Sequence, residues 1–306
     1  FLKGKNIRTI LLTIMIIAAA SVTANAVVVT APGYTAEIYA TYTDSPKSYS
    51  RHMTFDANGN LYVIQQDSGS VWRITPARVA SQFASGFTAP YSITWGGGTA
   101  YGDYLYVGAL NIFKVDLNGN KTYFATQTCT GSLAIDRPGN YGGYLYVGTG
   151  CTDDVDKIDT AGNVLPFSAW PGWTDGGEVD AISFDPGTAY GGLMYVASSY
   201  TPANASKSGI FKMSAGGTAT RFCSNIVASW ELAFDNTGLF GGLLYAIGIP
   251  SYGSPPSVYT VGVDGVATQF ATSSMLNGLG LAFGPDGALY VSEYSSRDGL
   301  VIINRI

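Results

Sequence analysis

The sequence has little charge, and no basic cluster occurs beyond its first ten residues. Of the 306 residues, 12% are Asp, Glu, Lys or Arg, and 16 basic residues against 21 acidic ones give a net charge of −5. Nucleic acids and anionic membrane surfaces are bound through concentrated Lys and Arg side chains. Neither is therefore expected as a partner, whereas a neutral or cationic ligand is compatible with the composition.

Histidine is scarce, with His52 alone. A mechanism that needs two histidines is thereby excluded, and no Gly-x-Ser-x-Gly motif marks a serine nucleophile. An imidazole changes its charge near neutral pH, which suits acid–base catalysis. A lone histidine at the start of a strand is also suited to structural hydrogen bonding, so both interpretations stay open.

The first 26 residues have the pattern of a secretory signal peptide. Three basic residues precede the apolar run 10–20, and Ala24-Asn25-Ala26 supplies the small-x-small pattern after which a signal peptidase cuts. The run is short for a hydrocarbon core of about 30 Å, which argues against the alternative of a membrane anchor. We expect residues 1–26 to be removed and residues 27–306 to form one domain, secreted or periplasmic and free of the membrane.

One short phrase returns six times: small and apolar residues, a turn rich in Gly, Asp or Pro, and a strand that ends in Leu/Met-Tyr-Val/Ala. Its tyrosines are 44, 40, 49, 50 and 45 residues apart: Tyr62, Tyr106, Tyr146, Tyr195, Tyr245 and Tyr290. This period is too long for one hairpin and fits a four-stranded propeller blade. The sequence therefore predicts an all-β fold, a six-bladed β-propeller with four antiparallel strands per blade.

The two ends of the repeat region complement each other. The sixth repeat stops after its third strand, at Leu300 to Ile306, and Tyr34 to Ala40 has the form of the missing fourth strand. Pairing these segments would remove an exposed sheet edge and hold the ring closed. We predict that the N-terminal strand completes the last blade.

Cysteine is also scarce, with Cys129, Cys151 and Cys223. Three cysteines in an exported protein allow one disulfide. Cys129 precedes the first strand of the third blade and Cys151 follows the second, and these antiparallel neighbours bring both residues to the same end. We predict a Cys129–Cys151 disulfide and an unpaired Cys223, whereas in a reducing compartment all three would be free thiols.

Three segments carry a resemblance to a known family. Pro90 to Trp95, Asp67 to Ile74 and Gly280 to Val291 resemble degenerate NHL repeats, which belong to the larger group of six-bladed propellers that includes the SMP-30/gluconolactonase-like and strictosidine-synthase-like proteins. The resemblance extends over about residues 34–306 and implies the propeller fold. It implies little about activity, because this fold hosts lactonases, lyases and sugar or protein binders alike.

Chemistry in such a ring is expected where the first strand of each blade begins, because these strands converge there on the axial tunnel. The Gly-rich turns that follow the first strands lie at the opposite face. Aligning the six first strands on their last large residue puts a mixed set of polar and aromatic side chains at the tunnel mouth. The ligand-binding candidates are Arg51, His52, Tyr91, Asp180, Trp230 and Glu231. The pattern assigns no catalytic residue among them.

The resemblance also implies a metal. Lactonases of the gluconolactonase-like group hold a divalent cation with a Glu, an Asn and an Asp at strand starts. Asp180 matches the Asp by position, Glu231 or Glu178 could replace the Glu, and Asn277 lies two residues too early to match the Asn. A hard cation such as Ca²⁺ needs several converging oxygen ligands. Calcium is one candidate cofactor; the alternative is that these carboxylates accept hydrogen bonds from strand-end amides or from Arg51.

The longer loops offer two further features. One is a set of carboxylates that could bind Ca²⁺ or a cationic ligand, or could simply be solvated: Asp153, Asp154, Asp156, Glu293 and Asp298. Their spacing is not that of an EF-hand. The other is a group of aromatic residues that could form a lip for a sugar or another flat ligand, or could pack over the blade edges: Trp170, Trp173 and Tyr200.

Together these features favour an exported binding or interaction module, expected to be a monomer, with its ligand at the tunnel mouth. A small molecule, a glycan and a protein are the candidate ligands. The alternative is a metal-dependent hydrolase of the lactonase type, or a lyase, that uses the same site. A full set of converging oxygen ligands would favour the enzyme, and the sequence does not supply one.

Overall fold

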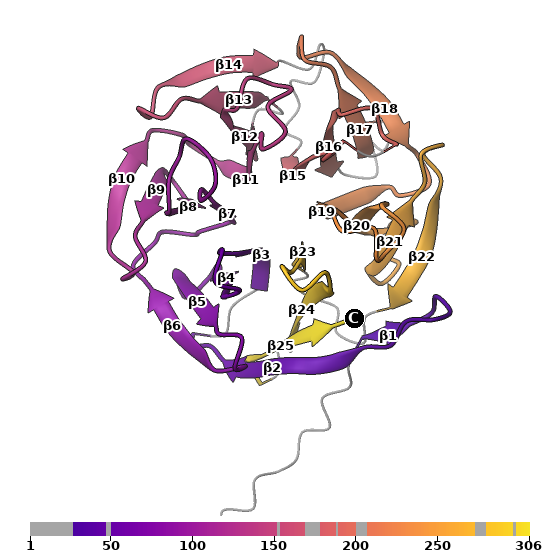
Figure 1. Cartoon of the computed structure of the whole chain (residues 1–306), viewed down its shortest axis with the longest axis horizontal. Helices are drawn as coiled ribbons and strands as arrows, with labels where there is room; N and C mark the ends of the chain where they lie inside the picture. Colours follow the sequence, from indigo (N-terminus) through magenta and orange to yellow (C-terminus); the bar gives the residue numbers. More distant parts are fainter. Residues whose placement is uncertain are drawn as a thin grey trace, which may run out of the picture.

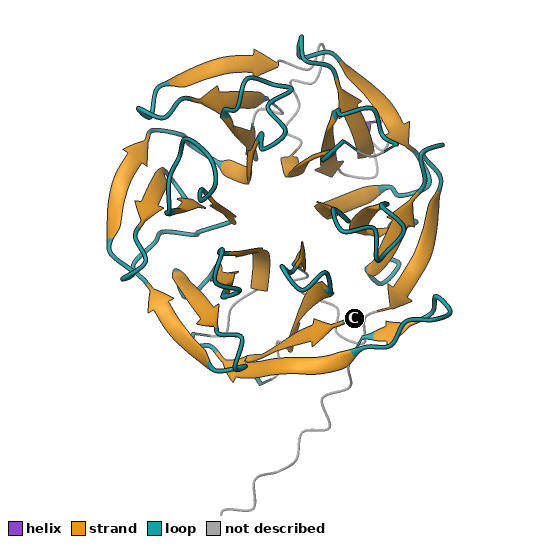
Figure 2. Ribbon diagram, in the orientation of Figure 1, coloured by secondary structure: helices purple, strands orange, loops and turns teal. Residues whose placement is uncertain are grey.

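The strands of this protein form six sheets arranged as a ring (Figures 1 and 2). The computed structural model describes residues 27–46, 50–151, 154–168, 178–187, 189–199, 207–272, 280–295 and 298–306. Every pair of neighbouring strands within a sheet is antiparallel. The predicted six-bladed β-propeller is confirmed.

Each of the first five blades takes four successive strands, from the axis outward. Blade 1 is β3 (Ser50–Phe55), β4 (Leu61–Gln65), β5 (Ser70–Ile74) and β6 (Ala80–Ala84). Blade 2 is β7 (Ser92–Trp95), β8 (Leu105–Gly108), β9 (Ile112–Val115) and β10 (Lys121–Ala125). Blade 3 is β11 (Thr130–Ile135), β12 (Leu145–Thr149), β13 (Val155–Ile158) and β14 (Val164–Ser168). Blade 4 is β15 (Glu178–Phe184), β16 (Met194–Ser199), β17 (Gly209–Met213) and β18 (Ala219–Cys223).

The N-terminal segment contributes to two blades. Blade 5 is β19 (Ala228–Phe234), β20 (Leu244–Ile249), β21 (Ser257–Val261) and β22 (Ala267–Thr272), with β1 (Val28–Val29) added as a fifth strand. Blade 6 is β23 (Leu281–Phe283), β24 (Leu289–Ser295), β25 (Leu300–Arg305) and β2 (Glu37–Thr43). The predicted closure is confirmed (Figure 1), although β2 starts three residues later than the predicted strand, and β1 was not predicted.

The repeated tyrosines brace the turn between the first and second strands of each blade. Each is at most 3% exposed. The hydroxyl groups of Tyr106 and Tyr146 donate to the carbonyls of Tyr101 and Tyr141, five residues earlier, at 2.8 and 2.7 Å. The equivalent residues of the other blades donate to the same turn, to a carbonyl or an aspartate: Tyr62, Tyr195, Tyr245 and Tyr290. This bond explains why the repeat has tyrosine, rather than phenylalanine, at that position.

A second tyrosine of the turn links one blade to the next. The hydroxyl of Tyr141 in blade 3 donates to the carbonyl of Met213 in blade 4 and accepts a bond of 2.8 Å from the N–H of Met194. Tyr101 and Tyr190 make the same pair of contacts from blade 2 to blade 3 and from blade 4 to blade 5. These buried hydroxyls satisfy the N–H group at the start of the second strand and the carbonyl at the end of the third strand of the next blade. They therefore fix neighbouring blades relative to each other.

An aspartate holds the turn that carries this tyrosine. Asp136 Oδ2 accepts bonds from the N–H groups of Tyr141 at 2.7 Å and Gly143 at 2.9 Å. Gly143 has a φ of 70°, a conformation that costs glycine little. The Gly-rich turns are therefore structural, because they present the linking tyrosine to the next blade.

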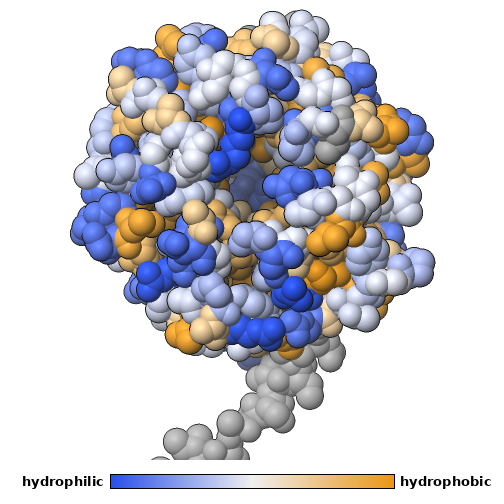
Figure 3. Space-filling view, viewed as in Figure 1, coloured by the Kyte–Doolittle hydropathy of each residue, from blue (hydrophilic) through white to orange (hydrophobic). Residues whose placement is uncertain are grey.

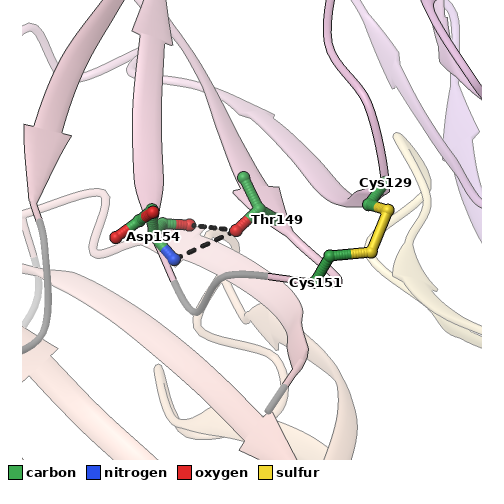
Figure 4. The surroundings of a disulfide bond; sticks show 4 residues. All are labelled: Cys129, Thr149, Cys151 and Asp154. Carbon is green, nitrogen blue, oxygen red and sulfur yellow. Dashed lines mark hydrogen bonds between the residues drawn. A yellow bond between two sulfur atoms is a disulfide. The ribbon is translucent and has the colours of Figure 1, made fainter. Parts of the chain in front are cut away.

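The predicted Cys129–Cys151 disulfide is present (Figure 4). Cys129 lies just before β11 and Cys151 just after β12, and their Cα atoms are 5.7 Å apart. Beside the disulfide, the N–H of Asp154 donates to the Thr149 hydroxyl at 3.0 Å. Cys223 is buried and unpaired. Among the described residues, no helix is long and apolar enough to cross a membrane.

The tyrosine links are expected to be measurable in stability. Tyr141→Phe should lower the free energy of unfolding by about 1–3 kcal/mol, because the buried N–H of Met194 loses its acceptor. Urea unfolding followed by tryptophan fluorescence would measure this. Tyr123→Phe is the matched control, since Tyr123 is 57% exposed and its loss should cost less than about 0.5 kcal/mol. Equal losses for the two variants would contradict the linking role.

Candidate functional site

A cavity of about 930 Å³ follows the axis of the ring. All six first strands line it, each with an apolar residue, then a small one, then a large one: Met53-Thr54-Phe55, Ile93-Thr94-Trp95, Leu133-Ala134-Ile135, Ile182-Ser183-Phe184, Leu232-Ala233-Phe234 and Leu281-Ala282-Phe283. The space-filling view shows the corresponding hollow in the middle of the ring (Figure 3). The small middle residues leave the room that a ligand would need.

The two ends of the cavity differ in character. At one end the lining continues into the turns after the first strands, where Arg137 and Asn236 contribute polar groups. At the other end it includes His52 of β3 and Glu231 of β19, which directly precede the apolar layer. The cavity thus reaches the face of the Gly-rich turns, which we expected to lie opposite the site. The position of the cavity depends on the size of the side chains along the first strands. The prediction rested only on the polar and aromatic residues at the start of these strands.

Irregularities of the first strands aim the polar residues. The register shifts between Val179 and Ala181 in β15, and between Ser229 and Glu231 in β19, so that Asp180 and Trp230 have no partner in the ladder. A similar shift in β3 spans Arg51 and His52. A β-bulge redirects the side chain that it leaves unpaired. The local backbone therefore places the candidate side chains, beyond what their spacing in sequence indicates.

His52 and Glu231 contact each other at the inner end of the cavity, which is the end where the first strands begin. Nδ1 of His52 lies 3.1 Å from Oε2 of Glu231, and the two residues are 6% and 7% exposed. Burial, and secondarily the Arg51 charge, lowers the pKa of His52 to about 3. Burial raises the pKa of Glu231 well above its usual range, and Asp180 adds to the increase. The imidazole of His52 is therefore neutral at neutral pH, and burial favours the protonated form of the Glu231 carboxyl group.

The Glu231 carboxyl group makes few hydrogen bonds. Oε1 accepts a bond of 3.3 Å from the N–H of Leu232. Oε2 is buried, and its 3.1 Å contact with Nδ1 of His52 lacks the alignment of a hydrogen bond, so the described residues provide it with none. An unmade bond at a buried polar atom costs about 1–3 kcal/mol, so such an atom at a cavity wall calls for an explanation. A ligand group in the cavity would supply the missing bond.

A second polar network adjoins the pair. The guanidinium of Arg51 donates to the Tyr91 hydroxyl at 2.8 Å and to Oε1 of Gln66 at 3.2 Å, and it lies 4.4 Å from the centre of the Tyr91 ring. Tyr91 donates in turn to Asp180 Oδ1 at 3.3 Å, and Ser199 donates to Oδ2 at 2.5 Å. Burial raises the pKa of Asp180 well above its usual range, and Glu178 contributes to this. The network joins blades 1, 2 and 4 across the axis.

The carboxylates do not form a cation site as they are arranged. Both oxygens of Asp180 already accept hydrogen bonds, and the Arg51 cation belongs to the same network. Glu178 is exposed. In the part of the chain that the structure describes, no three His, Cys, Asp or Glu side chains are placed to hold a metal ion. Within the described ranges, the carboxylates do not supply the several converging oxygen ligands that a divalent cation requires.

The six candidate residues fall into three groups. His52 and Glu231 line the cavity, and Arg51, Tyr91 and Asp180 form the adjoining network. Trp230 instead packs against the core cluster between blades 5 and 6. Sequence reasoning missed Gln66 and Ser199, which follow second strands, and it missed the small residues of the cavity wall. The repeated small residue before each large one was the available signal.

The loop candidates are mostly structural or undescribed. Asp156 accepts a bond of 2.9 Å from Gln127, and Glu293 is fully buried and accepts one of 2.8 Å from Asn304. The Ser295 hydroxyl lies 3.5 Å from Asp298. Several predicted positions lie outside the described residues: Asp153, Trp170, Trp173, Tyr200 and Asn277. The aromatic lip therefore stays a prediction.

The raised pKa of Glu231 predicts a pH-dependent stability. A carboxyl group whose folded pKa is raised stabilises the fold fully below its unfolded pKa, and this contribution is lost as the pH rises through the folded value. His52 acts in the opposite direction, but only between about pH 3 and 6.5. Above about pH 6.5 and up to the folded pKa of Glu231, Glu231→Gln should therefore flatten the decline of unfolding free energy by up to about 1.4 kcal/mol per pH unit.

Urea unfolding at several pH values would measure this slope. Glu37→Gln is the matched control, because Glu37 is half exposed and should leave the slope unchanged. If wild type and Glu231→Gln decline in parallel, Glu231 is ionised in the folded protein.

Comparisons with known proteins show the fold. No family model and no curated protein matches the sequence. A gluconolactonase from Xanthomonas campestris has a similar structure, with a TM-score of 0.67, 12% identity, and coverage of 92% of this chain and 95% of that chain. A streptogramin B lyase gives a TM-score of 0.54 at 12% identity, with 89% and 98% coverage. The virginiamycin B lyase of Staphylococcus aureus gives 0.55 at 11% identity, with 86% and 82% coverage.

The likeness extends over almost the whole of these chains and concerns architecture, since identity is near 12%. It agrees with the resemblance expected from the repeats. The chain therefore has the six-bladed propeller fold that gluconolactonase-like and streptogramin lyase proteins share.

Proposed function

We propose that this protein is a small-molecule-binding propeller that holds its ligand in the axial cavity. The observation that carries the proposal is Glu231 Oε2, a buried polar atom at the cavity wall that contacts His52 Nδ1 at 3.1 Å but receives no aligned hydrogen bond from the described residues. Such an atom is tolerated where a bound group satisfies it. The adjoining network supports the proposal, because Arg51 holds β3, the strand on which His52 lies, against blades 2 and 4.

The size and lining of the cavity suit a small ligand. Binding sites of about 300–1,000 Å³ that combine apolar walls with a few polar groups are typical of small-molecule sites. Here the walls carry Ile93, Leu133, Ile182 and Leu232, and the polar pair stands at one end. A neutral His–Glu pair can both donate and accept hydrogen bonds. We infer an uncharged ligand with an apolar body and a hydroxyl or carbonyl group at its inner end.

An enzyme is the second candidate, favoured by the same pair. A carboxyl group that keeps its proton near neutral pH can act as a general acid, and a neutral imidazole beside it can act as a base. The fold is shared with proteins named as a gluconolactonase and as streptogramin and virginiamycin B lyases. Under this proposal the cavity holds the substrate, and Glu231 with His52 handles the proton. Binding without turnover separates the two candidates.

Export and a monomeric state belong to the same proposal. The signal-peptide pattern of residues 1–26 and the disulfide support an oxidising compartment outside the cytoplasm. The sparse basic residues argue for a ligand other than nucleic acid or membrane. A glycan or protein ligand would require the exposed loops rather than the cavity.

Blocking the cavity should abolish binding. In a thermal-shift screen of uncharged lactones, sugars and aromatic alcohols, a ligand that raises the melting temperature of the wild type should have no effect on Ala134→Trp, because the indole would occupy the cavity. Glu231→Gln should weaken binding about tenfold, the equivalent of one hydrogen bond of about 1.4 kcal/mol. Calorimetry would give the affinities.

Val79→Trp is the matched control, since Val79 is 60% exposed. Binding that survives Ala134→Trp but is lost in Arg51→Ala would place the ligand at the Arg51–Tyr91–Asp180 network instead of in the cavity. Turnover of a lactone that Glu231→Gln lowers by 100-fold or more would replace the binding module by the enzyme.

A divalent cation should not stabilise the fold. A ligand that binds the folded state raises the melting temperature by mass action. Because we expect no cation to bind, about 1 mM Ca²⁺, Mn²⁺ or Zn²⁺ should change the melting temperature by less than about 1 °C. Thermal melts recorded with each cation and with a chelator as the control would measure the change. A rise that disappears in Asp180→Asn would reinstate the metal-dependent hydrolase.

A further inference from the structure

Val27 is anchored far more firmly than a chain end usually is. It would be the first residue of the mature chain if cleavage follows Ala26, yet it is 3% exposed. The first residues of most domains are poorly ordered unless something ties them down. Its neighbour Val28 is 57% exposed, so burial is specific to the residue that cleavage would make terminal.

The side chain of Val27 and the backbone that follows it are held between blades 5 and 6. Its side chain belongs to a core cluster with Phe270 of β22 and Leu289 of β24. The following residues pair with β22, and the N–H of Thr30 donates to the Phe270 carbonyl at 2.9 Å. The segment therefore crosses from one blade to the next immediately before β2 completes the ring.

The backbone nitrogen of Val27 meets a buried polar pair. It lies 3.2 Å from Oδ1 of Asn304, and Nδ2 of Asn304 donates to Oε2 of Glu293 at 2.8 Å. Asn304 and Glu293 are both fully buried. Asn304 thus connects the Val27 nitrogen to a carboxyl group inside the blade 5–6 interface. A buried carboxylate is strongly favoured by a positive charge nearby.

We propose that hydrolysis of the Ala26–Val27 peptide bond creates an α-ammonium group that binds the Asn304–Glu293 pair and stabilises the closed ring. Water adds across the bond, the carboxylate leaves with residues 1–26, and the amine of Val27 takes up a proton. In the precursor this nitrogen is a neutral amide with one hydrogen. In the mature chain it has three hydrogens and a charge, so removal of the signal peptide would complete the fold.

Other ionisable groups on the surrounding strands have other partners. Tyr245 of β20 donates to the Phe240 carbonyl, and Arg305 of β25 pairs with Asp286 and Glu37. The remaining tyrosines of these strands belong to other core clusters: Tyr259, Tyr290 and Tyr294. Glu293 is therefore the carboxyl group that the structure connects to Val27. An α-amino group stabilised in this way has a raised pKa, and its contribution is lost as the pH rises through that value.

Two chains that differ by one residue test the proposal. One begins at Val27 and the other carries a single Gly before Val27; both are released from a fusion partner by a protease that leaves no extra residue. The extra Gly keeps an N–H at Val27 but moves the charge by about 3.8 Å. At pH 6.5 the Val27 chain should melt about 2–4 °C higher. The difference should vanish by about pH 10.5, and it should be absent when both chains carry Glu293→Gln.

Two further measurements use the intact precursor and the amine itself. N-terminal sequencing of protein exported from the full-length precursor should begin at Val27. The α-amino group, labelled by reductive ¹³C-methylation, should titrate above its usual range of about 7.7–8.0. Equal melting temperatures at pH 6.5, a difference that persists unchanged at pH 10.5, or cleavage at another bond would overturn the proposal. None of these results depends on ligand binding in the axial cavity.

Discussion

The whole arrangement depends on backbone pairing between β2 and β25. Six Cα pairs, from Glu37 with Arg305 to Thr43 with Leu300, complete the last blade. The ion pairs at the same place are exposed: Glu37 contacts Arg78 of blade 1 at 2.7 Å and Arg305 at 3.8 Å. Exposed ion pairs contribute little. The strand pairing therefore closes the ring, and the axial cavity exists because six first strands are held around one axis.

The interfaces between blades are not all built alike. Tyrosine hydroxyls link blades 2 to 3, 3 to 4 and 4 to 5. Blade 5 has Phe240 at the equivalent position, which lacks a hydroxyl and stacks on Tyr34 at 4.8 Å between ring centres. The N-terminal segment thus supports the blade 5–6 interface where the tyrosine link is missing. The ring is held by repeated tyrosine side chains at three of its six interfaces and by the N-terminal segment at its closure.

The fold could be predicted from the sequence because each blade repeats the same pattern of strands and turns. The spacing of Tyr62, Tyr106 and their equivalents gave the number of blades, and the order of strands gave the Cys129–Cys151 pairing. The bulge at Asp180 could not be predicted, since one residue leaving a ladder changes no residue type. The bulge at Trp230 was likewise not predicted, and its partly buried side chain packs against the core cluster between blades 5 and 6. The axial tunnel was expected, but the extent of the cavity toward the turns was not, because it depends on six small side chains on six different strands.

Buried carboxyl groups of this protein differ in how many hydrogen bonds they receive. Burial alone would raise the pKa of Asp235, but bonds from Thr237, Gly242 and other turn groups bring it below its usual range. Asp235 is therefore stable as an anion that the turn itself neutralises. Glu231 receives a single backbone bond, and its pKa rises. The turns satisfy their aspartates with several hydrogen bonds, so the fold itself does not require a poorly satisfied carboxyl group at the cavity wall. Keeping such a group buried there is costly unless a ligand binds it.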